Sequence, residues 1–186
     1  MENLIFLFAT SFMLRFANSR KFRNYLIGNT GCSVLLNSGC RDFEKVTTKS
    51  GDNVYFTEFR ENDVKYGIIC VTLNDEYPQD KGQALLFNYI NKLRKSFFVL
   101  HHTGLQDAID WNNRSSLAYE DYWQDIDGKD WKIKAYTNTD IMAILYVKNI
   151  NQLDVKQQEL FLDSFYFNRQ PERIGIAASS IQKNKV

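Results

Sequence analysis

The chain has 186 residues, of which 44% are hydrophobic and 24% are charged. This composition is typical of a globular protein with one hydrophobic core, and it excludes a disordered chain. The formal net charge of +1 gives no strong electrostatic field, so we expect neither nucleic acid nor an anionic membrane as a partner.

The chain begins with an apolar run at residues 4–14, which is too short to span a bilayer and has the length of a signal-peptide hydrophobic region. Ala17 and Ser19 are the small residues that precede a cleavage site, whereas Glu2 is acidic where a signal peptide carries positive charge. Two interpretations stay open. Either residues 1–19 are a leader and the protein is exported to the periplasm or the outside of the cell, or they form an apolar N-terminal helix or anchor of a cytoplasmic protein.

Strand patterns follow in the first half of the chain. Residues 25–36 predict either a first strand pair or one strand interrupted at 28–31, where two glycines occur. Residues 54–59 and 66–73 predict a hairpin across a polar loop. The middle of its second strand is apolar without alternation, which indicates a strand covered on both faces.

After Pro78 the hydrophobic period changes from that of a strand to that of a helix. The helical stripe consists of Leu86, Ile90, Leu93 and Phe97, and is widened by Leu85 and Tyr89. Asp80 and Gln83 have the spacing of a capping box at the start of this helix. Residues 97–102 then predict a short strand, and 104–114 a loop or a short helical turn.

The most regular stretch is residues 119–148, where apolar and polar side chains largely alternate over three runs. Asp127-Gly128 and residues 138–140 separate the runs and have the small polar and glycine residues of tight turns. The stretch therefore predicts a three-stranded antiparallel meander.

A terminal helix is predicted at residues 154–165, with Asp154 as its N-cap. Residues 20–168 are then a single α+β domain, and residues 169–186 are a polar, aperiodic tail.

The cysteines and histidines match no metal or nucleophile pattern. Cys32, Cys40 and Cys70 lack zinc spacing and are interpreted as small hydrophobic residues, although export would allow one disulfide, Cys32–Cys40 or Cys40–Cys70. Cys70 lies in the most apolar strand, where burial suppresses thiol reactivity. His101 and His102 are adjacent on a predicted strand and point to opposite faces, so they do not bind one metal together.

The acidic turn between the first two meander strands contains Asp125, Asp127 and Asp130 around Gly128, with a faint likeness to a calcium loop. It lacks the glutamate of an EF-hand loop and has strands on both sides, so we interpret it as a solvated hairpin turn. No nucleotide-binding, metalloprotease or serine-hydrolase motif occurs in the sequence.

Aromatic residues gather in and before the meander, at Trp111, Tyr119, Trp123 and Trp131. Trp123 and Trp131 lie on either side of the Asp127-Gly128 turn, so they are predicted cross-strand neighbours. These rings form an exposed binding platform or part of the core, and we favour the core because most aromatic residues in strands pack inside.

The order of elements resembles that of the PsbP-like superfamily, which includes the photosystem II protein PsbP, Ran-binding Mog proteins and bacterial exported proteins. The resemblance rests on three segments: YGIICVTL at 66–73, the helix KGQALLFNYINKLRKSF at 81–97, and the ending FLDSF at 161–165. It implies a bacterial protein with an antiparallel sheet between helices and a docking or assembly role without catalysis. No functional residue of the family has a recognisable counterpart here.

We therefore predict an α+β fold with a central antiparallel sheet of six to seven strands and helices on its faces, an α/β/α sandwich. The predicted function is that of a non-enzymatic binding or accessory protein for a protein or cell-envelope partner, without cofactor, metal, nucleic acid or membrane span beyond an N-terminal anchor. The expected binding surface consists of Trp111, Tyr119, Trp123, Asp125, Asp127 and Asp130.

Two alternatives remain. In the first, the protein is a ligand carrier or a hydrolase-like enzyme that uses His101 or His102 with a nearby carboxylate, which requires a concave pocket beside the histidines. In the second, a lipid binds between sheet and helix in a cavity lined by Leu86 and Ile90.

Overall fold

A computed structural model describes residues 22–37, 42–61, 63–75, 78–110, 112–113 and 116–167. The predicted leader or helix at 1–19, Cys40, Trp111 and the predicted tail at 169–186 lie outside the described residues. The described elements are β1 (Phe22–Leu26), β2 (Ser33–Asn37), β3 (Glu44–Thr47), β4 (Asn53–Glu61), β5 (Val64–Thr72), α2 (Gln79–Ser96), β6 (Val99–His102), β7 (Gln106–Ala108), β8 (Leu117–Asp125), β9 (Asp130–Thr137), β10 (Ile141–Lys148), the 3-10 helix η1 (Ile150–Gln152) and α3 (Val155–Leu162).

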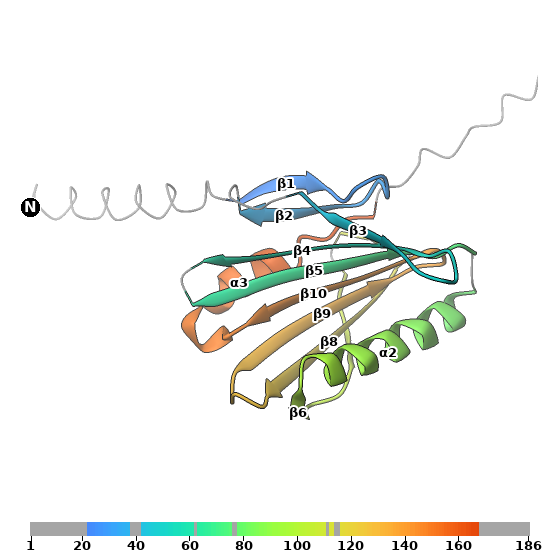
Figure 1. The fold of residues 1–186 in the computed structure, drawn as a ribbon. Coiled ribbons are helices and arrows are strands. Elements are labelled where there is room, and N and C mark those ends of the chain that lie inside the picture. The colour runs from blue at the N-terminus through green and yellow to red at the C-terminus, as the bar shows by residue number, and fades with distance from the viewer. Residues whose placement is uncertain are drawn as a thin grey trace, which may run out of the picture.

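The main body is an eight-stranded antiparallel sheet in the order β3-β4-β5-β10-β9-β8-β6, with β7 also paired to β8 (Figure 1). The predicted hairpin is β4–β5 and the predicted meander is β8–β9–β10, and both are confirmed. The predicted strand count was too low. The strands β3 and β7 were not predicted because they have only four and three residues, too few for a visible alternation.

The first strands form a separate two-stranded sheet, which decides between the two interpretations of residues 25–36. β1 pairs with β2, and the Ile27 amide donates to the Cys32 carbonyl across the turn at 2.9 Å. This small sheet and α3 cover one face of the main sheet, and α2 lies on the other (Figure 1).

β10 lies in the middle of the sheet and is buried along almost its whole length. Its residues alternate between the two cores: Leu145 and Val147 pack towards α3, whereas Ile144 and Tyr146 pack towards α2. A strand covered on both faces must be apolar at consecutive positions. This double cover explains why IMAILYV is apolar at consecutive positions, so the alternation predicted for residues 119–148 does not extend to β10.

The helix ends confirm one cap prediction and correct another. Asp154 caps α3 as predicted, since its side chain accepts from the Lys156 amide at 3.0 Å. The capping box at the start of α2 is wrong: Pro78 is the N-cap, no side chain makes a cap bond, and Asp80 lies in the first turn. There Asp80 is still favourable because it lies near the positive end of the helix dipole.

Two of the cysteines are neighbours in the core on the α3 side. Cys32 and Cys70 are both fully buried. A hydrogen bond with Cys32, together with burial, raises the pKa of the Cys70 thiol well above its usual value. A protonated thiol is a poor nucleophile, which agrees with the interpretation of Cys70 as a structural residue.

Trp123 and Trp131 face each other across β8 and β9, which confirms the predicted cross-strand pair. Their ring centroids are 6.3 Å apart, and Phe97 stacks on Trp131 at 5.1 Å. Each indole N–H also finds a buried carboxylate: Trp123 donates to Asp121 at 2.5 Å, and Trp131 donates to Asp125 at 2.9 Å. The pair therefore belongs to the core beneath α2.

We expect Trp123→Ala to lower the free energy of unfolding by about 3–5 kcal/mol, because it leaves a large cavity under α2. Urea unfolding followed by circular dichroism measures this loss. The control is Ile126→Ala, whose side chain is 64% exposed, with an expected change below about 0.5 kcal/mol. Equal, small effects of both substitutions would contradict the core position of Trp123.

Candidate functional site: a groove beside helix α2

The lateral position of α2 leaves part of its sheet face uncovered. Near the start of the helix, a Cβ at Gly82 would lie 2.8 Å from the carbonyl oxygen of Asn138 in the β9–β10 turn, so only glycine permits this close approach. Near its end, the Arg94 guanidinium pairs with the fully buried Asp121 of β8. These two contacts hold α2 over β8–β10 and away from β3–β5 (Figure 1).

The uncovered part of the sheet is apolar on the α2 side. Val54 and Phe56 of β4 and Ile69 of β5 point to this side and are only partly buried. The register places Phe56 directly opposite Ile69, and opposed residues share one face of a sheet. These three side chains form the floor of a groove.

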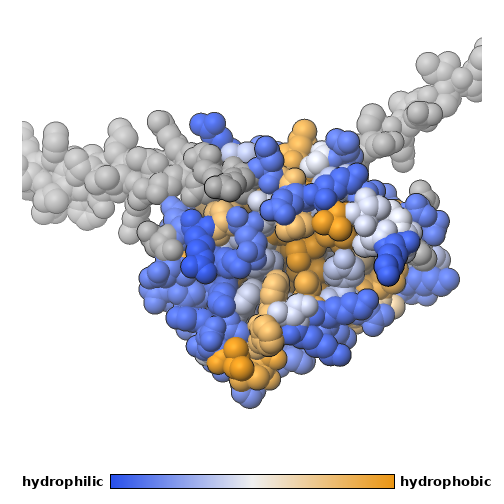
Figure 2. All heavy atoms as spheres, in the orientation of Figure 1, coloured by the Kyte–Doolittle hydropathy of each residue, from blue (hydrophilic) through white to orange (hydrophobic). Residues whose placement is uncertain are grey.

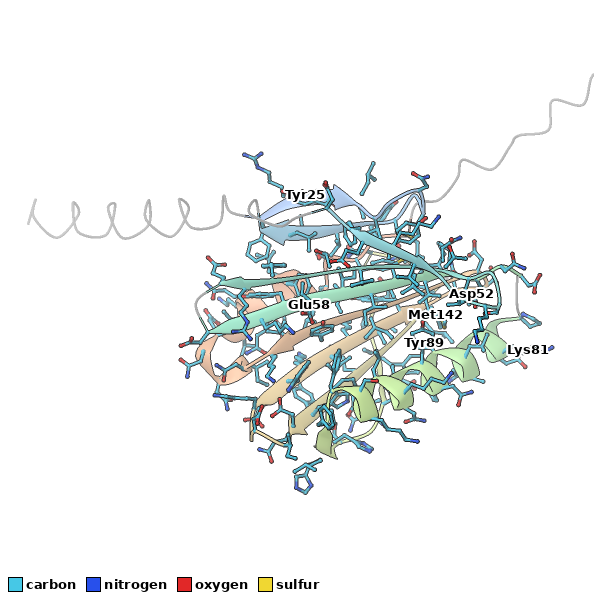
Figure 3. The ribbon with its side chains drawn as sticks, in the orientation of Figure 1. Tyr25, Asp52, Glu58, Lys81, Tyr89 and Met142 are labelled. Atoms are coloured by element: carbon cyan, nitrogen blue, oxygen red, sulfur yellow. The ribbon has the colours of Figure 1, made fainter. Side chains whose placement is uncertain are left out.

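Helix α2 provides one wall of this groove. Tyr89 and Leu93 lie one turn apart on the helix, and Phe97 continues the same row just beyond its end. All three are partly buried and pack against the core on the α2 side. In Figure 3, Tyr89 lies between α2 and the strands, and Glu58 lies over β4–β5.

Tyr146 closes one end of the groove, and Gly67 makes this possible. A Cβ at Gly67 would overlap the Tyr146 ring, so the ring lies across β5 only because that position has no side chain. The Tyr146 hydroxyl then reaches β4 and donates to Glu58, which also pairs with Lys65 at 2.6 Å. Burial, together with the bond to Glu58, raises the pKa of Tyr146 well above its usual value.

The resulting cavity, here called the α2 groove, has a volume of about 700 Å³. Pockets that hold a ligand typically measure about 300–1,000 Å³. Figure 2 shows this face of the molecule, with a hydrophobic strip in the middle and hydrophilic side chains on both sides. The β3 side of the groove carries the carboxylates of Asp42 and Glu44.

This groove was not predicted, although two of its signals are in the sequence. Tyr89 widens the apolar stripe of the helix, and β4 has apolar residues on both faces. A wide apolar stripe on a helix indicates that some of its apolar side chains lie beyond the part of the sheet that the helix covers. The overlap of Gly67 and Tyr146 depends on strand register and has no local signal.

The predicted aromatic surface is corrected by the structure. Tyr119 and Trp123 are only 3% and 2% exposed, because β8 turns both towards α2. Phe87 of α2 packs edge-on against Tyr119, with ring centroids 5.0 Å apart. These two residues therefore form no exposed platform, and Trp111 lies outside the described residues.

The three aspartates of the predicted acidic surface have three different environments. Asp125 is buried and accepts from Lys148 at 2.6 Å as well as from Trp131. Asp127 is exposed in the turn, and Asp130 accepts from the side-chain amides of Gln124 and Asn151. Asp125 also accepts from the backbone amides of Asp127 and Lys129, so its carboxylate holds a hairpin turn together.

Burial alone would raise the pKa of Asp125, but hydrogen bonds from Lys148, the Lys129 amide and Trp131 outweigh it. Together with the charge of Lys148, they hold the pKa of Asp125 below its ordinary value of 3.8. The carboxylate is thus ionised at neutral pH and fastens β8 to β10 across β9.

His101 and His102 lie exposed on β6, beside an open depression of about 390 Å³. The carboxylate that lines it is Asp130, which the amides already hold. In the described part of the chain, no group of three histidine, cysteine or acidic side chains is placed to hold a metal ion. The depression expected beside the histidines is present, but Asp130, which would be their carboxylate partner, already accepts hydrogen bonds from Gln124 and Asn151.

The α2 groove does not lie between Leu86, Ile90 and the meander, where the lipid alternative expected a cavity. Leu86 and Ile90 are fully buried and packed against the sheet, and neither of them lines the α2 groove. Over the described residues, no helix is long and apolar enough to cross a bilayer.

No family model matches the sequence, and no curated protein matches it. Among solved structures, the chain is similar to the Ran-binding protein Mog1p of Saccharomyces cerevisiae, with 9% identity over 78% of this chain and 95% of that one and a TM-score of 0.41. Mog proteins are among the members of the superfamily that the sequence resembles. A similarity at this level carries no argument about function, and the resemblance to the superfamily stays a prediction.

We expect Gly67→Ala to lower the free energy of unfolding by about 1–3 kcal/mol, because the new methyl group displaces the Tyr146 ring. Chemical denaturation measures the loss. The same substitution in a Tyr146→Leu background removes the overlapping ring atoms and should then cost less than about 1 kcal/mol. An equal cost in both backgrounds would show that Tyr146 does not close the groove end.

Asp125→Asn gives a pH-dependent prediction. Because the folded-state pKa of Asp125 is lowered, its stabilising effect is present above the unfolded-state value of about 3.8 and is lost as the pH falls through the folded-state value. The variant should therefore be less stable than the wild type by about 1–3 kcal/mol at pH 7. The difference should shrink below the unfolded-state value.

Urea unfolding from pH 7 to about pH 3 measures this difference. Asp127→Asn, an exposed change in the same turn, serves as the control and should stay within about 0.5 kcal/mol throughout. A difference for Asp125→Asn that does not vary with pH would rule out the ionised carboxylate as its cause.

Proposed function

We propose that the protein is a small binding protein that holds a segment of a partner protein in the α2 groove. The partly exposed floor and wall of the groove support this most directly. Phe56, Ile69 and Leu93 offer apolar surface in a concave site, and binding sites gain affinity from burying such surface.

The titratable groups of the groove favour binding over catalysis. Burial raises the pKa of both Tyr89 and Tyr146, so both phenols stay protonated and neutral at physiological pH. Glu58 is already engaged by Lys65 and by the Tyr146 hydroxyl. A neutral phenol and an engaged carboxylate can orient a ligand, but neither is activated as a base or a nucleophile.

The shape of the groove favours a segment of a protein chain. Its β3 side is formed by a four-residue edge strand of the sheet. A chain segment that enters from this side can place a few apolar side chains on the floor and leave the groove at the end that Tyr146 does not close. Such a binding mode places the affinity in a small number of anchor residues.

Leu93→Gln should weaken binding of peptides selected from a random displayed library on the wild-type chain by at least about tenfold, since it removes an apolar wall residue. Leu100→Gln is the matched control: Leu100 is 60% exposed on β6 and lies outside the groove. Fluorescence anisotropy with labelled peptides measures both affinities, and circular dichroism verifies that both variants are folded.

The proposal fails if no peptide is selected, or if the selected peptides bind the Leu93→Gln chain as tightly as the wild type. It also fails if Leu100→Gln is the variant that loses binding. That result would place the binding site at the exposed apolar tip formed by Phe98, Leu100 and Ile126.

A further inference from the structure

We infer that the segment held in the α2 groove is cationic as well as apolar, and that it places a lysine or arginine side chain against the β3 side. This inference rests on the proposed function, and it specifies the chemistry of the partner.

The charged residues that line the groove are all acidic. They are Asp42, Glu44 and Glu58, and no lysine, arginine or histidine is among the described residues of the lining. The whole chain has a net charge of +1, so this excess of negative charge is local. Carboxylates of one sign around an apolar site raise the local concentration of cationic ligands.

Two of these carboxylates are free to take a ligand. Glu58 is balanced by Lys65 at 2.6 Å. By contrast, Asp42 and Glu44 are exposed, and within the described ranges neither has a cationic side chain within 4 Å. A bound lysine or arginine would therefore form a new ion pair without breaking an existing one.

The strand register places the charge beside the apolar floor. Glu44 lies directly opposite Phe56 in the β3–β4 pair, so its side chain stands on the same face of the sheet as the floor. The next pair on this face is Val46 and Val54. A lysine or arginine has an apolar stem with a charged end, and it can pack the stem on Phe56 and Val54 while the cation reaches Glu44.

The same charges disfavour the lipid alternative. A fatty acid or an anionic phospholipid would bring its head group to the edge of the groove, where Asp42, Glu44 and Glu58 repel it. The apolar floor can bind a lipid tail as well as an apolar side chain. The acidic side of the groove favours the cationic peptide, because it repels an anionic lipid head group.

The experiment compares library-selected peptides with analogues in which lysine and arginine are replaced by glutamine. These are titrated against wild type, Asp42→Asn/Glu44→Gln and Glu159→Gln. Glu159 is an exposed glutamate on α3, which packs on the opposite face of the sheet, and serves as a matched control.

We expect the selected sequences to be enriched in lysine or arginine next to apolar residues. Asp42→Asn/Glu44→Gln should weaken binding at low salt by about two- to fivefold for each of the two carboxylates that it removes, with little change for Glu159→Gln. Because exposed charges are screened, the difference between wild type and Asp42→Asn/Glu44→Gln should disappear near 1 M salt, where the Debye length is about 3 Å.

Peptides that need Leu93 but show no basic enrichment, or that bind Asp42→Asn/Glu44→Gln as tightly as wild type, would overturn the inference and leave the proposed function standing. Tighter binding of oleate than of any selected peptide, lost in Leu93→Gln, would overturn the cationic-peptide inference and assign the groove to lipid. Absence of any peptide that depends on Leu93 would overturn the proposed function itself.

Discussion

The width of the sheet, set against the width of one helix, determines where this protein has a free apolar face. Seven strands in the order β3 to β6 are separated by six spacings of about 4.8 Å, which gives a face about 29 Å wide. A helix with its side chains is about 10–12 Å across. On the α3 side, the β1–β2 sheet adds further cover, whereas on the other side α2 packs over β8–β10 and leaves β3–β5 open.

The position of the helix follows from polar contacts more than from its apolar stripe. The stripe alone would allow α2 to pack over any pair of strands. The Arg94–Asp121 pair and the close approach of Gly82 to Asn138 select the meander side. A buried carboxylate such as Asp121 is costly without its partner, so displacing the helix would leave a charge unpaired in the core. The groove therefore exists because these two contacts hold α2 over β8–β10 and leave β3–β5 uncovered.

How much the sequence could predict depended on the range of the interactions involved. Alternation over eight or nine residues identified β8 and β9, and helical spacing identified α2, because both signals lie within one element. The same signals do not tell which face another element covers. For this reason the sequence allows Trp123 to lie either in the core or on a binding surface. The packing of α2 buries it and so places it in the core. The overlap of Tyr146 with Gly67 joins residues 79 positions apart and leaves no local pattern.

The central claim is that ligands occupy the α2 groove, and methyl NMR tests it most directly. Spectra of the full chain, labelled at isoleucine, leucine and valine methyl groups, would be recorded with and without a library-selected peptide. The account predicts that the largest shift changes fall on Val54, Ile69 and Leu93, which line the groove, while Leu100, Ile126 and Leu160 stay unchanged. Changes concentrated at Leu100 and Ile126, with none at Ile69 and Leu93, would contradict the account.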